Sequence, residues 1–226
     1  AVGANCHIMA GAGSNCTKTA IEATKKAKDA GVDSVLQVVP YYNKPSQEGL
    51  FQHFSKIAQS ISLPIMLYNI PGRTSKNLDI ETVQRLSTIS NIVAIKEASG
   101  SIETVETLNI KLPESFEIYS GDDALTLDFM KKGAVGVVSV ASHVVGNQLQ
   151  SMVQLMRQNH VEKAEAIHQS LLPLFDVLFI TANPVPVKKA LALMGNNVGS
   201  VRLPLVEATQ SEESAIKNVL QQLTII

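Results

Sequence analysis

Residues 64–98 contain two apolar runs, PIMLYNI (64–70) and IVAIKEA (92–98), separated by the turn PGRTSKNL and the amphipathic segment DIETVQRLSTI (79–89). Short apolar runs that end at turn signals are typical of strands buried on both faces, whereas the amphipathic segment has the period of a helix. Two strands joined by a single helix pair in parallel. The stretch therefore predicts a strand–helix–strand unit.

The same alternation extends outward from this unit in both directions. Six apolar runs recur along the chain: HIMAGAG (7–13), SVLQVVP (34–40), PIMLYNI (64–70), IVAIKEA (92–98), FEIYSGD (116–122) and GVVSVAS (136–142). Amphipathic segments separate them, and no low-complexity stretch interrupts the pattern. This spacing predicts an α/β fold with a parallel sheet, and it fits both a (β/α)8 barrel and an open doubly wound sheet.

After residue 143 the pattern becomes helical only. The last segments are VGNQLQSMVQLMRQ (145–158), VEKAEAIHQSLLPLFDVLF (161–179), PVPVKKALALMG (184–195) and SEESAIKNVLQQL (211–223). We interpret them as a final crossover helix followed by a helical extension.

The composition excludes several classes of protein. The 226 residues are 45% hydrophobic and 17% charged with a formal net charge of -1, which argues against disorder and against nucleic-acid binding. No apolar run approaches the roughly 18 residues of a membrane-spanning helix. Two cysteines form no disulfide framework, so we expect reduced thiols in a cytoplasmic protein. The expected partner is a small molecule or another copy of the chain.

The histidines and cysteines show no ligand spacing, and we infer no metal. Three histidines fall on predicted helices, and we expect them at the surface or at an interface; they are His53, His160 and His168.

In either α/β architecture the functional residues follow the C-terminal ends of the strands. That rule selects Asn15, Tyr41, Tyr42, Tyr68, Asn69, Arg73, Lys96, Glu97, Asp122 and Asp123.

Lys96 is the most informative of these residues. Side chains alternate along a strand, so Lys96 shares a face with Ile92 and Ala94, while Glu97 points the other way. Apolar surroundings are expected to lower the pKa of the lysine, and a free amine attacks carbonyl carbons to form an imine. The alternative is a structural lysine paired with a carboxylate such as Asp122.

Tyr68 and Arg73 lie near the end of the neighbouring predicted strand. A phenol at Tyr68 could exchange protons with an imine, and a guanidinium at Arg73 suits the recognition of a carboxylate. The alternatives are a core aromatic and a surface arginine. The turn AGAGSN (10–15) lacks the third glycine of a dinucleotide fingerprint, so it is better interpreted as a tight turn.

Several segments, taken in order, resemble the dihydrodipicolinate synthase family of pyruvate-dependent class I aldolases. They are AGAGSN (10–15), PYYNKPSQEGL (40–50), LYNIPGRT (67–74), IKEASG (95–100), SGDDALTLDF (120–129), GVVSV (136–140), NPVPVKKAL (183–191) and RLPL (202–205). The resemblance implies a (β/α)8 TIM barrel, with six of its eight strands in residues 1–160, and a C-terminal helical domain in residues 161–226. It also implies a homotetramer built as a dimer of dimers.

The resemblance assigns roles to five residues. The lysine that matches Lys96 forms an imine with pyruvate, whose enamine attacks L-aspartate 4-semialdehyde to give 4-hydroxy-tetrahydrodipicolinate, a precursor of diaminopimelate and lysine. No cofactor is implied. The residue matching Tyr68 relays protons, and the one matching Tyr42 reaches across the tight dimer interface. Arg73 matches the arginine that binds the aldehyde substrate's carboxylate, and Val138 matches a position whose carbonyl lines the pyruvate site.

Relatives inhibited by lysine bind it through residues that match Asn15 and Tyr41, together with a glutamate at the position of Thr19. Threonine offers no charged acceptor to an amine, so we expect weak feedback inhibition.

Family members carry two further strand–helix units before the AGAGSN turn, and the second ends in a Gly-Thr-Thr-Gly-Glu motif. This sequence contains neither, and we expect an N-terminally truncated chain. The Thr-Thr pair supplies a relay hydroxyl and donors to the pyruvate carboxylate, so family membership does not imply activity of the 226-residue chain.

Two other functions compete with the synthase. N-acetylneuraminate lyase and keto-deoxy-sugar-acid aldolases share the lysine and the tyrosine, but Arg73 and Tyr42 favour the synthase. A catalytically inactive chain that serves only as an oligomer partner would fold and assemble, yet form an imine slowly or not at all.

Overall fold

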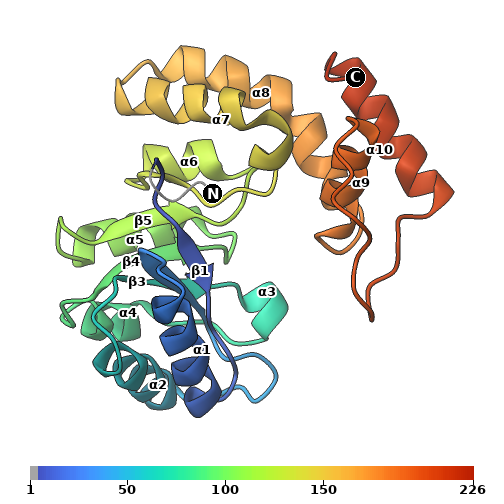
Figure 1. Cartoon of the computed structure of the whole chain (residues 1–226). Coiled ribbons are helices and arrows are strands. Elements are labelled where there is room, and N and C mark those ends of the chain that lie inside the picture. Colours follow the sequence, from blue (N-terminus) through green and yellow to red (C-terminus); the bar gives the residue numbers. More distant parts are fainter. Residues whose placement is uncertain (1–4) are drawn as a thin grey trace. The chain divides into compact units, whose positions relative to one another are not determined.

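The structure is a computed structural model that describes residues 5–226 (Figure 1). Its strands are β1 Met9–Gly11, β2 Ser34–Val38, β3 Ile65–Asn69, β4 Ile92–Glu97, β5 Glu117–Ser120 and β6 Gly136–Val137. Its helices are α1 Thr17–Asp29, α2 Gln47–Gln59, α3 Pro71–Thr74, α4 Ile80–Leu86, α5 Ile102–Lys111, α6 Thr126–Lys131, α7 Ser142–Arg157, α8 Val161–Val177, α9 Val185–Leu193 and α10 Gln210–Gln222. The six predicted strands and the helical C-terminal part are confirmed.

The strands form one six-stranded sheet in the order β1-β2-β3-β4-β5-β6, and every adjacent pair is parallel. A doubly wound sheet reverses its strand order at a switch point, whereas a (β/α)8 barrel keeps consecutive strands adjacent. The observed order therefore resolves the ambiguity left by the sequence pattern in favour of barrel topology.

The register of the sheet aligns three residues at its C-terminal edge. Tyr68 of β3 pairs with Lys96 of β4, and Lys96 pairs with Tyr119 of β5. Paired residues of neighbouring parallel strands project from the same face. The sheet thus places one tyrosine on each side of Lys96.

Helices α1, α2, α4 and α5 follow one another in contact along the sheet, as Figure 1 shows. Helix α2 begins where the Ser46 hydroxyl accepts a hydrogen bond from the Gly49 amide at 3.1 Å, which satisfies one of the amides left open in the first turn. The buried side of α2 carries Leu50, Phe54 and Ile57.

Two of the histidines expected at the surface or at an interface are buried within the chain itself. His53 of α2 and His168 of α8 are each 5% exposed, so the prediction for them was wrong. The imidazole of His53 shares a hydrogen bond with the Thr17 hydroxyl of α1 at 2.9 Å, and His168 packs against Phe175. The hydroxyl of Thr17 satisfies one nitrogen of the buried His53 ring, and sequence period alone does not reveal that contact.

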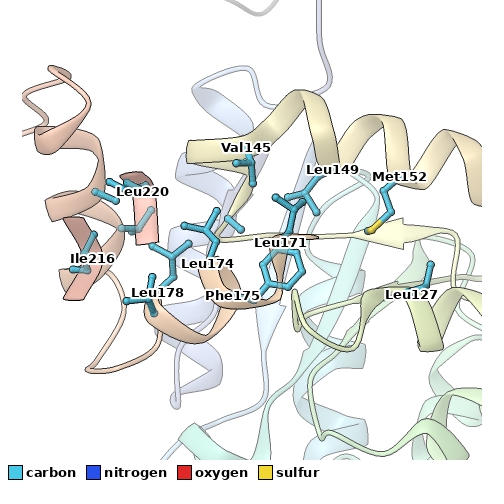
Figure 2. Close-up of a cluster of buried hydrophobic side chains, with 14 of the residues drawn as sticks. Leu127, Val145, Leu149, Met152, Leu171, Leu174, Phe175, Leu178, Ile216 and Leu220 are labelled. Carbon is cyan, nitrogen blue, oxygen red and sulfur yellow. The ribbon is translucent and has the colours of Figure 1, made fainter. Parts of the chain in front are cut away.

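The chain divides into two compact units, which are residues 1–122 with 128–137 and residues 123–127 with 138–226. The second unit has its own apolar core, drawn in Figure 2. Within it α7 packs along α8, and α9 packs against α10. The core side chains labelled there include Leu149, Leu174, Phe175, Ile216 and Leu220. The predicted boundary at residue 160 stays a prediction.

Among residues 5–226, no helix has the length and apolar character needed to cross a membrane.

Candidate active site

Lys96 and Tyr68 lie together at the C-terminal edge of the sheet. The Lys96 Nζ is 4.2 Å from the centroid of the Tyr68 ring, close enough for a cation–π contact. Both residues are partly exposed. The pair therefore brings an amine and a phenol ring together at this edge of the sheet.

Burial raises the pKa of the Tyr68 phenol, and the positive charge of Arg73 opposes that rise. Like an unperturbed tyrosine, Tyr68 is therefore protonated near neutral pH, and its hydroxyl can donate a hydrogen bond. Arg73 is exposed on the short helix α3, which begins with Pro71 directly after β3. The sequence predicted a rigid turn there, and the structure forms one helical turn that carries the guanidinium.

Glu97 follows Lys96 in the chain but faces a different environment. It is 1% exposed, and its Oε2 accepts a hydrogen bond from Asn69 Nδ2 at 3.0 Å, while its Oε1 accepts one from the Ser99 amide at 2.6 Å. Burial raises the pKa of the Glu97 carboxyl, and the bonds from Ser99 and Asn69 lower it. Its position on the opposite face from Lys96 agrees with the predicted alternation.

Asn69 links this carboxyl to the loop after α3. Its Nδ2 also donates to Asn77 Oδ1 at 2.9 Å, and its Oδ1 accepts from the Leu78 amide at 3.0 Å. Asn69 and Glu97 thus tie the ends of β3 and β4 to the segment that follows Arg73. This geometry gives Asn69 and Glu97 a structural role.

Tyr42 occupies an unusual backbone conformation in the loop between β2 and α2. Its φ is +74°, and the amide of Asn43 donates to the carbonyl of Tyr41 at 2.9 Å across it. A positive φ at a bulky residue carries strain that surrounding structure must hold. The residue Tyr42 is 88% exposed, and Tyr41 is 44% exposed.

Two of the regulatory positions predicted from the resemblance, Asn15 and Tyr41, lie on linked loops, and the third, Thr19, lies on α1. The side chain of Asn43 donates to the carbonyl of Asn15 at 2.8 Å, which joins the loop of Tyr41 to the loop before α1. Thr19 is exposed on the first turn of α1. The structure therefore connects the loops of Asn15 and Tyr41.

Val138 and Asp123 belong to the second compact unit. Asp123 is buried, and its Oδ2 accepts hydrogen bonds from the amides of Val140 and Ala141 at 3.0 and 2.9 Å. This carboxylate therefore holds the segment that follows Val138 and leads into α7. The role of the Val138 carbonyl stays a prediction.

Within residues 5–226, no group of three or more His, Cys, Asp or Glu side chains could hold a metal ion.

Comparison with known proteins identifies the family. The profile of the Dihydrodipicolinate synthetase family matches residues 1–223. The chain belongs to this family. It is 55% identical over 217 residues to 4-hydroxy-tetrahydrodipicolinate synthase 1 of Halalkalibacterium halodurans, an alignment that covers 96% of this chain and 74% of that protein.

Solved structures of dihydrodipicolinate synthases share the fold. The enzyme of Cyanidioschyzon merolae with lysine bound is 47% identical, with a TM-score of 0.96, over 98% of this chain and 75% of that one. The chloride-inhibited enzyme of Acinetobacter baumannii complexed with pyruvate is 39% identical, with a TM-score of 0.97, over 100% of this chain and 77% of that one. The chain is thus six strand–helix units of a (β/α)8 barrel with a C-terminal helical part.

For this dihydrodipicolinate synthetase family chain, the strand-end rule selected Asn69 without its structural role, and it did not select Gly121. The amide of Asn69 acts through hydrogen bonds to residues up to 28 positions away, and only the sheet register brings it to Glu97. Gly121 lies beside the stem of Lys96, where a side chain would meet the lysine. The SGDD motif (120–123) could have indicated a crowded turn, but it drew attention to its aspartates.

Proposed function

We propose that this chain carries the imine-forming site of a 4-hydroxy-tetrahydrodipicolinate synthase, with Lys96 as the nucleophile toward pyruvate. The observation that carries the proposal is the position of Lys96 Nζ over the ring of Tyr68, on paired strands at the C-terminal edge of the sheet. The names of the relatives and the pyruvate complex of the Acinetobacter baumannii enzyme support the choice of substrate.

The first step joins Lys96 to pyruvate. The unprotonated amine attacks the C2 carbonyl of pyruvate, and loss of water from the resulting carbinolamine gives an imine. The imine withdraws electrons from C3, so a C3 proton can leave and an enamine forms. C3 of the enamine then attacks the aldehyde carbon of L-aspartate 4-semialdehyde, and the new alkoxide takes up a proton. The amine of the aldehyde substrate displaces Lys96 as the product ring closes.

Tyr68 is the proposed proton donor and acceptor for these steps. A phenol is protonated at neutral pH, so Tyr68 can donate a proton to the carbinolamine hydroxyl that leaves as water. Loss of this hydroxyl in Tyr68→Phe is expected to slow imine formation while leaving the ring beneath Lys96 in place.

The position of Arg73 supports the proposal that the aldehyde substrate carries a carboxylate. Its exposed guanidinium stands one helical turn beyond the end of β3, and guanidinium groups bind carboxylates with two parallel hydrogen bonds. L-aspartate 4-semialdehyde carries such a carboxylate, so the position of Arg73 suits it as the aldehyde substrate.

The exposure of Tyr42 supports the proposal that a second copy of the chain completes the site. A strained backbone holds an almost fully exposed phenol away from the chain's own surface. We propose that Tyr42 reaches the proton relay of a partner subunit in a homotetramer built as a dimer of dimers.

We also propose a cytoplasmic location, because a chain with two cysteines and no disulfide framework suits a reducing compartment.

Proton exchange at pyruvate tests the proposed chemistry. An enamine at Lys96 replaces the methyl protons of pyruvate with deuterium in D2O, which proton NMR follows as loss of the methyl signal. The chain should accelerate this loss, and Lys96→Met, which keeps most of the length of the side chain but lacks the amine, should abolish the acceleration. Addition of L-aspartate 4-semialdehyde should then consume pyruvate, whereas N-acetylneuraminate should release none.

Acceleration by a folded Lys96→Met variant equal to that of the unchanged chain would overturn the proposal. Release of pyruvate from N-acetylneuraminate, without condensation of the semialdehyde, would instead select the lyase. A folded oligomer that does not exchange the methyl protons would identify an inactive partner chain.

A further inference from the structure

Gly121 follows strand β5 directly, and hydrogen bonds hold its backbone against β4. Its amide donates to the carbonyl of Glu97 at 2.7 Å, and the amide of Ala98 donates to the carbonyl of Asn69 at 2.9 Å. These bonds continue the sheet one step beyond the assigned strands. The backbones at Gly121 and Ala98 therefore have little freedom to separate.

A β-carbon at Gly121 would meet two neighbours at distances that carbon atoms do not tolerate. It would lie 2.8 Å from Ala98 Cβ, 2.9 Å from Lys96 Cε and 3.1 Å from Lys96 Cγ. Carbon atoms pack best at about 3.5–4.0 Å. The Ala98 Cβ moves only with its backbone, so the stem of Lys96 is the part that can yield, by rotating away.

Backbone conformation does not explain the glycine. Among the described residues, the glycines with positive φ are Gly31, Gly100, Gly133, Gly195 and Gly199, and Gly121 is not one of them. The constraint at Gly121 is therefore one of space. Gly146 of α7 provides a contrast, because an added β-carbon there would have no neighbour within 4 Å.

We propose that Gly121 is a positioning residue for Lys96. The missing side chain leaves room for the stem of the lysine, so that its amine stays over the ring of Tyr68. The inference rests on the proposed function, in which that amine attacks pyruvate. Displacement of the amine would slow the attack, because misplacement of a reacting group by about 1 Å can lower a rate by about 10²-fold.

The rate of imine trapping tests this role. The unchanged chain, Gly121→Ala and Gly146→Ala are incubated with pyruvate and borohydride, and intact mass follows the reduced adduct. Gly146→Ala should react like the unchanged chain, and Gly121→Ala should react on the order of 10- to 100-fold more slowly. Urea unfolding of each variant separates this effect from loss of the fold.

A double variant separates crowding of the backbone from displacement of the lysine. Gly121→Ala with Ala98→Gly removes the contact fixed by the backbone and keeps both contacts with Lys96, so it should fold and still react slowly. Recovery of the full rate in the double variant would overturn the inference, as would a full rate in Gly121→Ala. Either result leaves the proposed function intact, because the unchanged chain still forms its adduct. Absence of an adduct in the unchanged, folded chain would overturn the proposed function and this inference together.

Discussion

Lys96 and Glu97 are consecutive residues of β4 with opposite surroundings. The amine of Lys96 lies over the Tyr68 ring, whereas the carboxyl of Glu97 is buried among donors on the other side of the strand. The alternation of side chains along a strand predicted this division from the sequence. It did not predict the donors, because Asn69 comes from another strand.

Replacement of Glu97 by Gln is expected to destabilise the chain by about 1–3 kcal/mol. One oxygen of the carboxyl accepts from Ser99 and the other from Asn69, so an amide must turn a donor toward a donor. Asn69 cannot rotate its own amide without losing the bond from Leu78. Urea unfolding measures the loss.

The double variant Glu97→Gln with Asn69→Asp is the matched control. Its Gln amide can donate to the new carboxylate, and the Leu78 amide keeps an acceptor, so part of the stability should return. Equal stability of Glu97→Gln and the unchanged chain would show that the Asn69–Glu97 pair contributes nothing to the free energy of unfolding.

Thr19 offers a second prediction at a single position. Lysine is expected to bind the chain weakly, because Thr19 has no charge for its amine, and Thr19→Glu is expected to bind it more tightly, by the roughly 1.5–3 kcal/mol of a charged hydrogen bond. Calorimetric titration with lysine measures both affinities, with Thr19→Gln as the uncharged control. Tight binding to the unchanged chain would contradict the expectation.

At the scale of elements, the apolar runs and helical periods predicted every strand of the sheet and the helices of the C-terminal part. Strand order required the structure, since a run of strands and helices has the same pattern in a barrel and in an open sheet. Helix α3 was expected as a turn, because Pro71 and Gly72 indicate chain reversal and a single helical turn has no measurable period.

Burial of His53, where α2 contacts α1, predicts a loss of stability in acid. Burial lowers the pKa of His53 to about 4 from 6.5. Above pH 6.5 the imidazole is neutral in both states; as the pH falls toward 4, the unfolded chain binds a proton that the folded chain excludes. The unfolding free energy should therefore fall by on the order of 2–3 kcal/mol between pH 6.5 and 4 because of His53. Below pH 4 the contribution of His53 should not change further.

Comparison with His53→Asn isolates that contribution. Asparagine does not titrate and can still form a hydrogen bond with Thr17. Urea unfolding at several pH values should show a smaller acid loss in the variant than in the unchanged chain. The same pH dependence in both would assign the loss to other groups.

At the scale of the whole molecule, the chain combines a sheet unit with a helical unit that has its own core. The family resemblance predicted a helical part, but compactness divides the chain within the turn after β5 and again after β6. Proximity of backbone segments that are distant in the sequence decides that division, and this proximity has no local signature in the sequence.

Phe175 lies within the core of the helical unit, as Figure 2 shows, and is 2% exposed. Phe175→Ala should lower the unfolding free energy of that unit by roughly 3–5 kcal/mol through lost burial and the cavity it leaves. Phe179 is 47% exposed, so Phe179→Ala should cost much less. Circular dichroism during urea unfolding compares the two; equal losses would contradict the assigned core.

Every proposed step of the reaction depends on Lys96 forming an imine. Incubation with pyruvate and borohydride converts that imine to a stable secondary amine, which peptide mass mapping locates. We expect one adduct, on Lys96, that disappears in Lys96→Ala. An adduct on other lysines only, or none on a chain shown to be folded, would contradict it.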